Sequence, residues 1–222
     1  MLSPLNEGGA PVILCAVRDI TERGALEEQL MRRTKELETL HVQLTELASR
    51  DPLTSLHNRR SFGEQLEWLL RNACRRRESL SLLMIDLDRF KRVNDRFGHA
   101  EGDRTLRAVS EAIAGACRQN DVAARYGGEE FAVALPDTDA AGSLLVAENV
   151  RHAIEDIAGL RERITASIGA ATWVCGEDAA VPPQTADELI AQADRALYRA
   201  KAEGRNCVRH GGAQAAAGHL SV

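Results

Sequence analysis

Two adjacent glutamates that follow two glycines are the main chemical feature of this sequence. Segment 125–131 reads Arg-Tyr-Gly-Gly-Glu-Glu-Phe, and an apolar run follows it at 132–135. Adjacent glycines allow a sharp turn and a close approach to a ligand, so the segment predicts a β-hairpin tip. Carboxylates at such a tip suit a hard cation such as Mg²⁺, which shares its coordination with water and substrate phosphates. Taken alone, the pattern also fits a solvated turn.

A second acidic pair follows the apolar run 80–87, where Asp86 and Asp88 come at its end. A nearly continuous apolar run of this length predicts a central strand with carboxylates at its carboxyl end. If this strand and the hairpin are neighbours in one sheet, their carboxylates converge as a two-metal phosphoryl-transfer site requires. The spacing alone does not show that they are neighbours, and Asp-x-Asp is also common in solvated loops.

The remaining elements predict the fold class. Helices are expected at 58–77, 103–117, 140–157 and 186–202, and further strands at 164–174 and 206–209. This βααββαβ-like alternation predicts an α/β fold with helices packed on a sheet. Asp51 precedes Pro52, which ends the helix before it, and residues 51–54 are expected to cap the next helix.

The N-terminal part carries a different pattern. Residues 11–17 form a short apolar run that predicts one strand, which cannot fold by itself. From residue 21 to 49, leucines recur on alternating four- and three-residue steps, at Leu26, Leu30, Leu37, Leu40, Leu44 and Leu47. Arg33 stands where a seventh leucine would complete the seam. The pattern predicts a two-stranded coiled coil, and the alternative is a single amphipathic helix packed on its own domain.

Composition bounds the class of protein. The 222 residues are 44% hydrophobic and 27% charged, as in a globular domain with attachments. The net charge of −5 gives no general attraction for a nucleic acid polymer, so an anionic ligand must be held by a local cluster. Five widely spaced cysteines without zinc-ligand spacing indicate buried thiols in a reducing compartment. The expected location is the cytoplasm, and the sequence leaves open a membrane anchor upstream of residue 1.

Four ordered blocks, 51–60, 86–103, 125–131 and 194–206, resemble the signature blocks of the GGDEF family of diguanylate cyclases. The resemblance covers 51–210 and implies a nucleotidyl-cyclase-like α/β domain, with a mixed sheet surrounded by helices and a coiled-coil signalling helix before it. Residues 8–23 resemble the end of a PAS sensor domain. The expected organisation is therefore a PAS-like terminal strand at 1–20, a heptad linker helix at 21–50, the catalytic domain at 51–210 and a disordered tail at 211–222.

The resemblance implies condensation of two GTP molecules into cyclic di-GMP, with release of two pyrophosphates, in a site that two protomers complete. It implies that Asp86, Glu129 and the Leu87 carbonyl bind Mg²⁺, with Mn²⁺ as a possible substitute. Glu130 is a further metal ligand or the proton acceptor. The chain is therefore expected to act as a homodimer, with an N-terminal sensory domain missing from it.

The same resemblance assigns the substrate contacts. Asn94 and Asp103 are the expected guanine-binding residues, because a carboxylate accepts from guanine N1 and N2 in a way that adenine cannot match. The expected phosphate ligands are Lys91, Lys201 and Arg205, and the two glycines that let the backbone approach the α-phosphate are Gly127 and Gly128.

Arg118 and Asp121, just upstream of the hairpin, resemble the family's product-inhibition site, where cyclic di-GMP binds. The alternative is a charge pair at the end of a helix. Ser55 and His57 stand where the family usually has glycine and proline, and we expect them to alter the stiffness of a turn and leave the chemistry unchanged.

A catalytically silent receptor for GTP or cyclic di-GMP is the competing function. Silent members of the family typically lose acidic or guanine-binding positions, and this sequence retains all of them. The sequence therefore favours the enzyme.

Overall fold

The computed structural model describes residues 4–7, 10–13, 29–35, 49–174 and 185–211. The chain divides into two compact units, Met1–Ala48 and Ser49–Val222, and each is described by itself. No helix among the described residues is long and apolar enough to cross a membrane.

The first unit contains a small antiparallel hairpin. Strand β1 (Pro4–Glu7) pairs with β2 (Ala10–Ile13), with Pro4 opposite Ile13. The strand predicted at 11–17 is confirmed for residues 11–13, and its partner β1 was not expected; residues 14–17 lie outside the described part. Residues 29–35 are helical, and Leu30 and Met31 are 59% and 76% exposed. The seam leucines other than Leu30 lie outside the described residues.

The second unit is built on one mixed six-stranded sheet in the order β3-β5-β6-β4-β7-β8. The two outer pairs, β3–β5 and β7–β8, are parallel, and the three inner pairs are antiparallel. The strands are β3 (His57–Asn58), β4 (Leu80–Leu87), β5 (Val122–Arg125), β6 (Glu130–Pro136), β7 (Ala166–Trp173) and β8 (Val208–Gly211). The elements from β4 to β7 run in the order βααββαβ, in which α3 (Phe90–Phe97) is a helix that none of the expected residue ranges contained.

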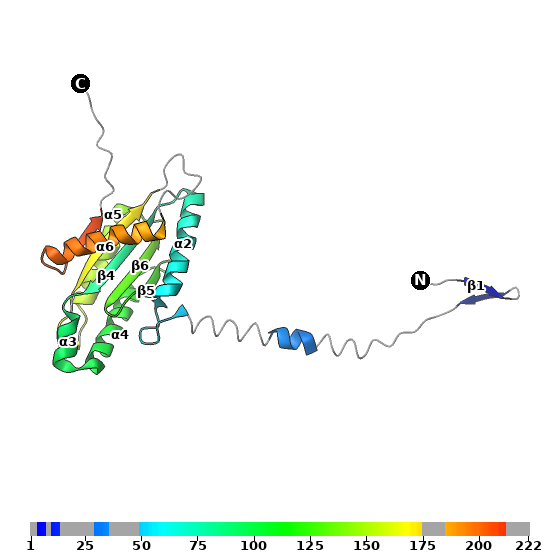
Figure 1. Ribbon diagram of the computed structural model, residues 1–222, viewed down its shortest axis with the longest axis horizontal. Coiled ribbons are helices and arrows are strands. Elements are labelled where there is room, and N and C mark those ends of the chain that lie inside the picture. The colour runs from blue at the N-terminus through cyan, green and yellow to red at the C-terminus, as the bar shows by residue number, and fades with distance from the viewer. Residues whose placement is uncertain (1–3, 8–9, 14–28, 36–48, 175–184, 212–222) are drawn as a thin grey trace, which may run out of the picture. The chain divides into compact units, whose positions relative to one another are not determined.

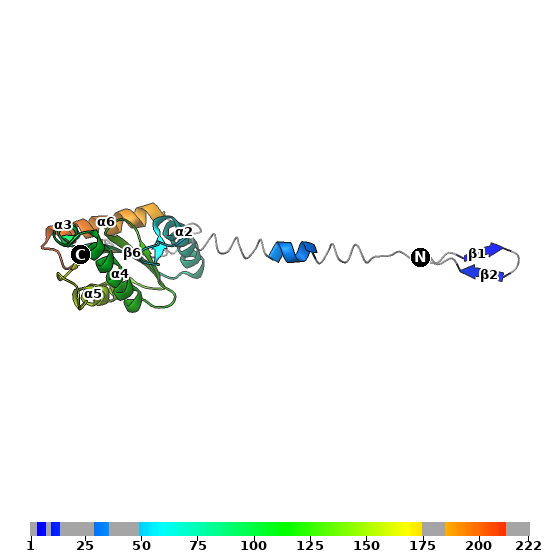
Figure 2. The same cartoon turned by 90° about the horizontal axis from the view of Figure 1, so that it is seen from below.

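Helices cover both faces of this sheet (Figures 1 and 2). Helices α2 and α6 lie on one face, α4 and α5 lie on the other, and the short α3 packs beside α4. Their bounds are α2 (Arg59–Arg76), α3 (Phe90–Phe97), α4 (His99–Ala116), α5 (Ala140–Glu155) and α6 (Ala186–Ala202).

The central strand β4 shows why both faces are covered. Leu80, Leu82 and Met84 pack into the core with α2 and α6, whereas Leu83 and Ile85 pack into the core with α4 and α5. Successive side chains of a strand point to opposite faces, so a strand with apolar residues on both faces requires a helical layer on each side. By the same alternation, Asp86 belongs to the face that α2 and α6 cover.

The turn before α2 differs from the expectation that residues 51–54 cap this helix. The N-cap is Asn58, whose side chain accepts a hydrogen bond from the Ser61 amide at 2.9 Å. Asp51 instead holds the turn that precedes it, accepting from the Thr54 amide at 2.9 Å. Ser55 in this turn has a φ of 61°, which is left-handed. Glycine adopts this conformation without strain, whereas serine does so at a cost.

Helix α3 is absent from the sequence-based expectations, and α4 begins at His99 where a start at Asp103 was expected. Only Phe90 and Val93 of α3 are buried, so its eight residues give little apolar periodicity. The helix is framed by Arg89 and Gly98, which have φ values of 58° and 81°. Its boundaries are therefore set by two backbone bends that the sequence pattern did not indicate.

The cysteines that the structure describes form no disulfide bonds. Cys74, Cys117 and Cys207 are half-buried, and the other two cysteines lie outside the described residues. Burial, together with the nearby Asp121 carboxylate, raises the pKa of Cys117 to about 12. A thiol with so high a pKa is a poor nucleophile at neutral pH.

Helix α6 approaches the sheet closely because β7 carries a glycine. A Cβ atom at Gly169 would overlap the carbonyl oxygen of Ala193 and the amide nitrogen of Leu197. Both obstructing atoms belong to the α6 backbone and cannot rotate away.

We predict that Gly169→Ala lowers the free energy of unfolding by roughly 3 kcal/mol or more, since it must push α6 off the sheet. Denaturant titration followed by circular dichroism measures the change. Gly63→Ala is the matched control, because the α2 glycine has open space around its Cβ position. It should raise stability by up to about 1 kcal/mol through helix propensity. Equal effects of the two substitutions would contradict the close α6 contact.

Candidate active site

The strand and the hairpin bring their carboxylates together, as the sequence analysis expected for neighbouring strands. Asp86 at the end of β4 lies directly opposite Glu130 at the start of β6 in the antiparallel register. The amide of Leu87 donates to the carbonyl oxygen of Glu129 at 3.2 Å. Residues directly opposite each other share one face with Cβ atoms about 5 Å apart. The pairing therefore places two like charges side by side.

The glycine turn is closed by its own backbone. The amides of Tyr126 and Gly127 both donate to the carbonyl oxygen of Glu130, at 2.8 and 3.1 Å. Neither Gly127 nor Gly128 is among the residues with positive φ. A Cβ at Gly127 would overlap the Glu130 carboxylate, whereas Gly128 faces open space. The glycine at 127 thus gives room to a carboxylate.

Arg125 ties this turn to the beginning of the domain. Its Nη2 donates to the carbonyl oxygen of Gly128 at 2.8 Å, and its Nη1 lies 3.2 Å from both carboxylate oxygens of Asp51. Burial alone would raise the pKa of Asp51, but hydrogen bonds from Thr54 and the Arg125 charge outweigh it and lower that pKa. The sequence analysis did not assign this role to Arg125, since a pairing 74 residues apart leaves no local pattern.

A lysine from α6 balances the acidic cluster. Lys201 lies in the last turn of that helix, and its Nζ is 2.7 Å from Oδ2 of Asp86. Burial and the Asp86 charge raise the pKa of Glu129; Lys201 opposes this effect, and Glu130 adds to it. Lys201 therefore offsets only part of the negative charge of Asp86, Glu129 and Glu130.

These donors fit a divalent cation that also binds other oxygens. Asp86 and Glu129 offer hard oxygen ligands; burial and, after it, the Asp86 charge raise the pKa of Glu129, and a bound cation would oppose both effects. Among the described residues, no three acidic, histidine or cysteine side chains are grouped closely enough to hold a metal by themselves. Water or substrate phosphates must complete the coordination.

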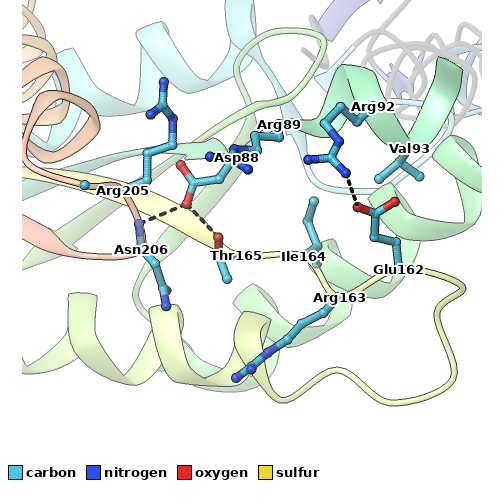
Figure 3. Close-up of a pocket in the computed structure, with 11 residues that line it drawn as sticks. Asp88, Arg89, Arg92, Val93, Glu162, Arg163, Ile164, Thr165, Arg205 and Asn206 are labelled. Carbon is cyan, nitrogen blue, oxygen red and sulfur yellow. Dashed lines mark hydrogen bonds and ion pairs between the residues drawn. The ribbon is translucent and has the colours of Figure 1, made fainter. Parts of the chain in front are cut away.

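Asp88, two residues after Asp86, serves a different purpose. Its carboxylate accepts from Thr165 Oγ1 at 2.7 Å and from the Asn206 amide at 3.0 Å, as Figure 3 shows, and also from Ser167 Oγ at 2.7 Å. The residue is 8% exposed. Its acceptor capacity is used by the protein, so Asp88 positions the loop after α6.

That loop carries Arg205 and is held from a second side. The Asn206 side chain donates to Glu155 Oε1 at 2.8 Å, and Glu155 Oε2 accepts from Arg151 Nη1 at 2.8 Å. Arg205 and Asn206 both have positive φ, at 65° and 44°. Asn206 donates these hydrogen bonds to two carboxylates, Asp88 and Glu155, and so holds a turn whose left-handed conformation is uncommon for arginine and more readily adopted by asparagine.

The two residues expected to bind guanine come from α3 and α4. Asn94 is half-buried, and its side chain lies against Gly102, where a Cβ would overlap the Asn94 Oδ1 atom. Asp103 follows directly and is exposed. Lys91, on the first turn of α3, is exposed as well. Gly102 was not singled out from the sequence, although it lies within one of the resembling blocks.

Arg118 and Asp121 are not part of the acidic cluster. They lie in the loop before β5, at the opposite end of that strand from Arg125. The Arg118 amide donates to Asp121 Oδ2 at 2.7 Å. Burial raises the pKa of Asp121, and the hydrogen bond and charge of Arg118 oppose this shift. The contact is local, and the exposed Arg118 side chain leaves this loop open to an additional ligand.

Comparison with known proteins gives the family. Residues 48–207 match the model described as "Diguanylate cyclase, GGDEF domain". The chain is 38% identical over 207 residues to diguanylate cyclase DgcM of Escherichia coli (strain K12), covering 92% of this chain and 45% of that protein. It is 39% identical over 197 residues to the response regulator PleD of Caulobacter vibrioides, covering 86% and 42%.

A solved structure agrees with this assignment. The coiled coil and GGDEF domain of DgcB from Caulobacter crescentus, in complex with c-di-GMP, matches with a TM-score of 0.73 and 31% identity. The match covers 84% of this chain and 99% of that one. The chain therefore belongs to the GGDEF family of diguanylate cyclase domains. It spans less than half the length of the curated relatives DgcM and PleD.

The charge crowding at Glu129 predicts a pH-dependent effect on stability. Its pKa is higher in the folded than in the unfolded chain, so the ionised form destabilises the fold at neutral pH, and the cost disappears as the pH falls through the folded pKa. Without metal, Glu129→Gln should raise the free energy of unfolding at pH 7 by less than about 1 kcal/mol, because the side chain is partly solvated.

Urea unfolding in the presence of a chelator, at pH 7 and near pH 4, measures this change. The gain should vanish at the lower pH. Glu64→Gln, at an exposed carboxylate on α2, is the control and should give no comparable gain. A Glu129→Gln protein less stable than wild type at pH 7 would contradict the crowding.

Proposed function

We propose that this chain is a diguanylate cyclase, which condenses two GTP molecules into cyclic di-GMP and releases two pyrophosphates. The observation that carries the proposal is the pairing of Asp86 with the Glu129-Glu130 hairpin, in a chain of the GGDEF family. Two relatives named as cyclases or bound to c-di-GMP, DgcM and DgcB, support the reaction class. GTP as the substrate favours a cytoplasmic site of action.

A divalent metal, Mg²⁺ or Mn²⁺, would be held by Asp86, Glu129 and the Leu87 carbonyl. When bound, such an ion neutralises the triphosphate and lowers the pKa of the attacking 3′-hydroxyl. Glu130 is placed beside these residues to act as a further ligand or to accept the 3′-hydroxyl proton. Lys201, now paired with Asp86, becomes free to bind phosphate once a metal takes over the balance of charge.

Guanine recognition is assigned to Asn94 and Asp103. Asp103 accepts from guanine N1 and N2, and the missing side chain of Gly102 leaves room for Asn94 beside it. Lys91, Lys201 and Arg205 bind the β- and γ-phosphates, with Arg205 able to present two parallel N–H groups.

The product joins two nucleotides, and one Asp86–Glu130 pair offers one nucleotide site, so the proposal includes a homodimer whose sites face each other. The heptad helix at 21–50 would bring the protomers together, and the exposed Leu30 and Met31 are available for such pairing. Residues 1–20 are assigned to the end of a PAS domain, 51–210 to the catalytic domain and 211–222 to a tail.

The first functional prediction concerns turnover. The protein incubated with GTP and Mg²⁺ should form cyclic di-GMP, with a rate per protomer that rises with protein concentration. Glu129→Gln should lower kcat at least about 100-fold, since it removes one charged ligand of the metal. Chromatographic separation of the nucleotides gives the rates.

Glu64→Gln is the matched control and should keep the wild-type rate, while circular dichroism shows that both variants fold. GTP binding without any product in a metal-loaded dimeric sample would refute the cyclase and support the silent receptor. Full activity of Glu129→Gln would refute the metal assignment.

The second functional prediction concerns product inhibition at Arg118 and Asp121. Arg118→Ala should raise the inhibition constant of added cyclic di-GMP about tenfold, because it removes a charge-assisted contact to phosphate. Initial rates are measured against each variant's own uninhibited rate. Arg107→Ala removes another exposed arginine, on α4, and serves as the control. If both variants keep the wild-type inhibition curve, the Arg118–Asp121 contact is only a local turn.

A further inference from the structure

A pocket of about 260 Å³ lies beside the loop that carries Arg205. Three segments form it: the bend into α3 at 88–93, the stretch before β7 at 162–165, and the loop after α6 at 204–206 (Figure 3). Lys91, Lys201 and the acidic pair Asp86 and Glu129 are not among its lining residues. The pocket therefore adjoins the candidate active site and shares Arg205 with it.

The lining is strongly basic. Four arginines, at 89, 92, 163 and 205, stand against two carboxylates, Asp88 and Glu162. The Asp88 charge is already compensated by hydrogen bonds from Thr165, Ser167 and the Asn206 amide. Arg163 points away from the other arginines in Figure 3 and pairs with Glu155 at 2.9 Å. The pocket therefore retains three arginines that could bind an anion, Arg89, Arg92 and Arg205, and one carboxylate, Glu162.

Arg89 and Arg205 lack internal partners. Among the described residues, neither guanidinium group takes part in a hydrogen bond or ion pair, although both residues line the pocket. Both have left-handed backbones, with φ values of 58° and 65°. This conformation is uncommon for arginine, and here it occurs on two loops that border one cavity. Two cations held beside one cavity in this way favour an anion between them.

The third arginine is weakly paired. Arg92 Nη2 lies 3.4 Å from Glu162 Oε1, and Arg96 Nη1 lies 3.7 Å from Glu162 Oε2. That Oε2 atom is buried and accepts no hydrogen bond in the described part of the chain. A 3.4 Å ion pair with a half-exposed arginine contributes little stability. A phosphate group could therefore take Arg92 from Glu162.

We propose that this pocket binds inorganic pyrophosphate through Arg89, Arg92 and Arg205, as a subsite next to the place where the leaving group forms. The choice of this anion rests on the proposed function, which releases two pyrophosphates per product. The pocket is smaller than the roughly 300–1,000 Å³ of sites for drug-sized ligands and is lined mainly by charged groups. Planar guanidinium groups bind phosphate oxygens in bidentate fashion, so three of them suit a compact, highly charged anion.

Calorimetric titration of the full chain with sodium pyrophosphate, in a chelator and without GTP, tests the binding. Arg92→Gln should weaken binding about tenfold through loss of one charged hydrogen-bond donor. Arg96→Gln is the matched control: Arg96 also lies on α3 and contacts Glu162, but it does not line the pocket. It should stay within about twofold of wild type, as expected for a surface charge. Equal affinities of the wild-type and Arg92→Gln proteins would overturn the proposal.

A second variant is expected to bind pyrophosphate more tightly than the wild type. Glu162→Gln removes the carboxylate that competes for Arg92, so it should tighten pyrophosphate binding by about two- to fivefold. Weaker binding in this variant would contradict the assigned role of Glu162. Inorganic phosphate, titrated in parallel, should bind more weakly than pyrophosphate; equal affinity would overturn the assignment to pyrophosphate.

Kinetics separate this subsite from the GTP site. When pyrophosphatase removes the product, Arg92→Gln should have the same KM for GTP as the wild type. When pyrophosphate is added without pyrophosphatase, the variant should be inhibited less than the wild type. A parallel rise in KM would show that the pocket is part of the triphosphate site and would overturn the separate subsite. Absence of cyclic di-GMP formation would refute the proposed function but leave the calorimetric result standing. Turnover without pyrophosphate binding would refute the pocket alone.

Discussion

The main electrostatic constraint on this GGDEF domain is the repulsion between carboxylates at one edge of its sheet, which the rest of the fold must compensate. The antiparallel register of β4 and β6 fixes Asp86 opposite Glu130, and the hairpin adds Glu129 beside them. Like charges directly opposite each other in a sheet are destabilising. The compensating charge comes from another layer, because Lys201 reaches Asp86 from the end of α6. The fold therefore stabilises an unfavourable cluster that a bound cation would relieve.

Several contacts far apart in the sequence hold that cluster in place. Gly169 allows α6 to lie close enough to β7 for its last turn to reach the sheet edge. Asp88 and Glu155 fix the loop that carries Arg205, and Arg125 links the glycine turn to Asp51. None of these contacts requires a ligand. The described side chains are thus preorganised around the cluster, which is the condition for electrostatic catalysis.

The fold could be predicted from the sequence wherever burial produces a strong pattern. The strand at 80–87 and the helix at 186–202 have the predicted bounds, because the strand is a nearly continuous apolar run and the helix combines an apolar stripe with a capping box. Helix α3 was missed because most of its surface is solvated and backbone bends at Arg89 and Gly98 define its ends. Local periodicity carries no signal for such an element.

Some residues of the candidate site can likewise be found from the sequence, and others are revealed only by tertiary contacts. Asp86 and the Glu129-Glu130 pair could be found from the sequence because their residue types and family blocks are distinctive. Asp88 could not be separated from Asp86 by spacing, since only its tertiary hydrogen bonds show that its acceptors are occupied. The sequence also did not indicate that Gly127 makes room for the Glu130 carboxylate, because that contact depends on the side-chain conformation of Glu130.

The turn that begins the domain has a mechanical consequence. Ser55 is held in a conformation that costs a non-glycine residue roughly 1 kcal/mol, while its amide donates to the Asp51 carbonyl at 2.9 Å. The Asp51 side chain, in turn, holds Arg125 and through it the glycine turn. The backbone at the entry to the domain is therefore connected to the carboxylate hairpin through two side chains, Asp51 and Arg125, and not through the strands of the sheet.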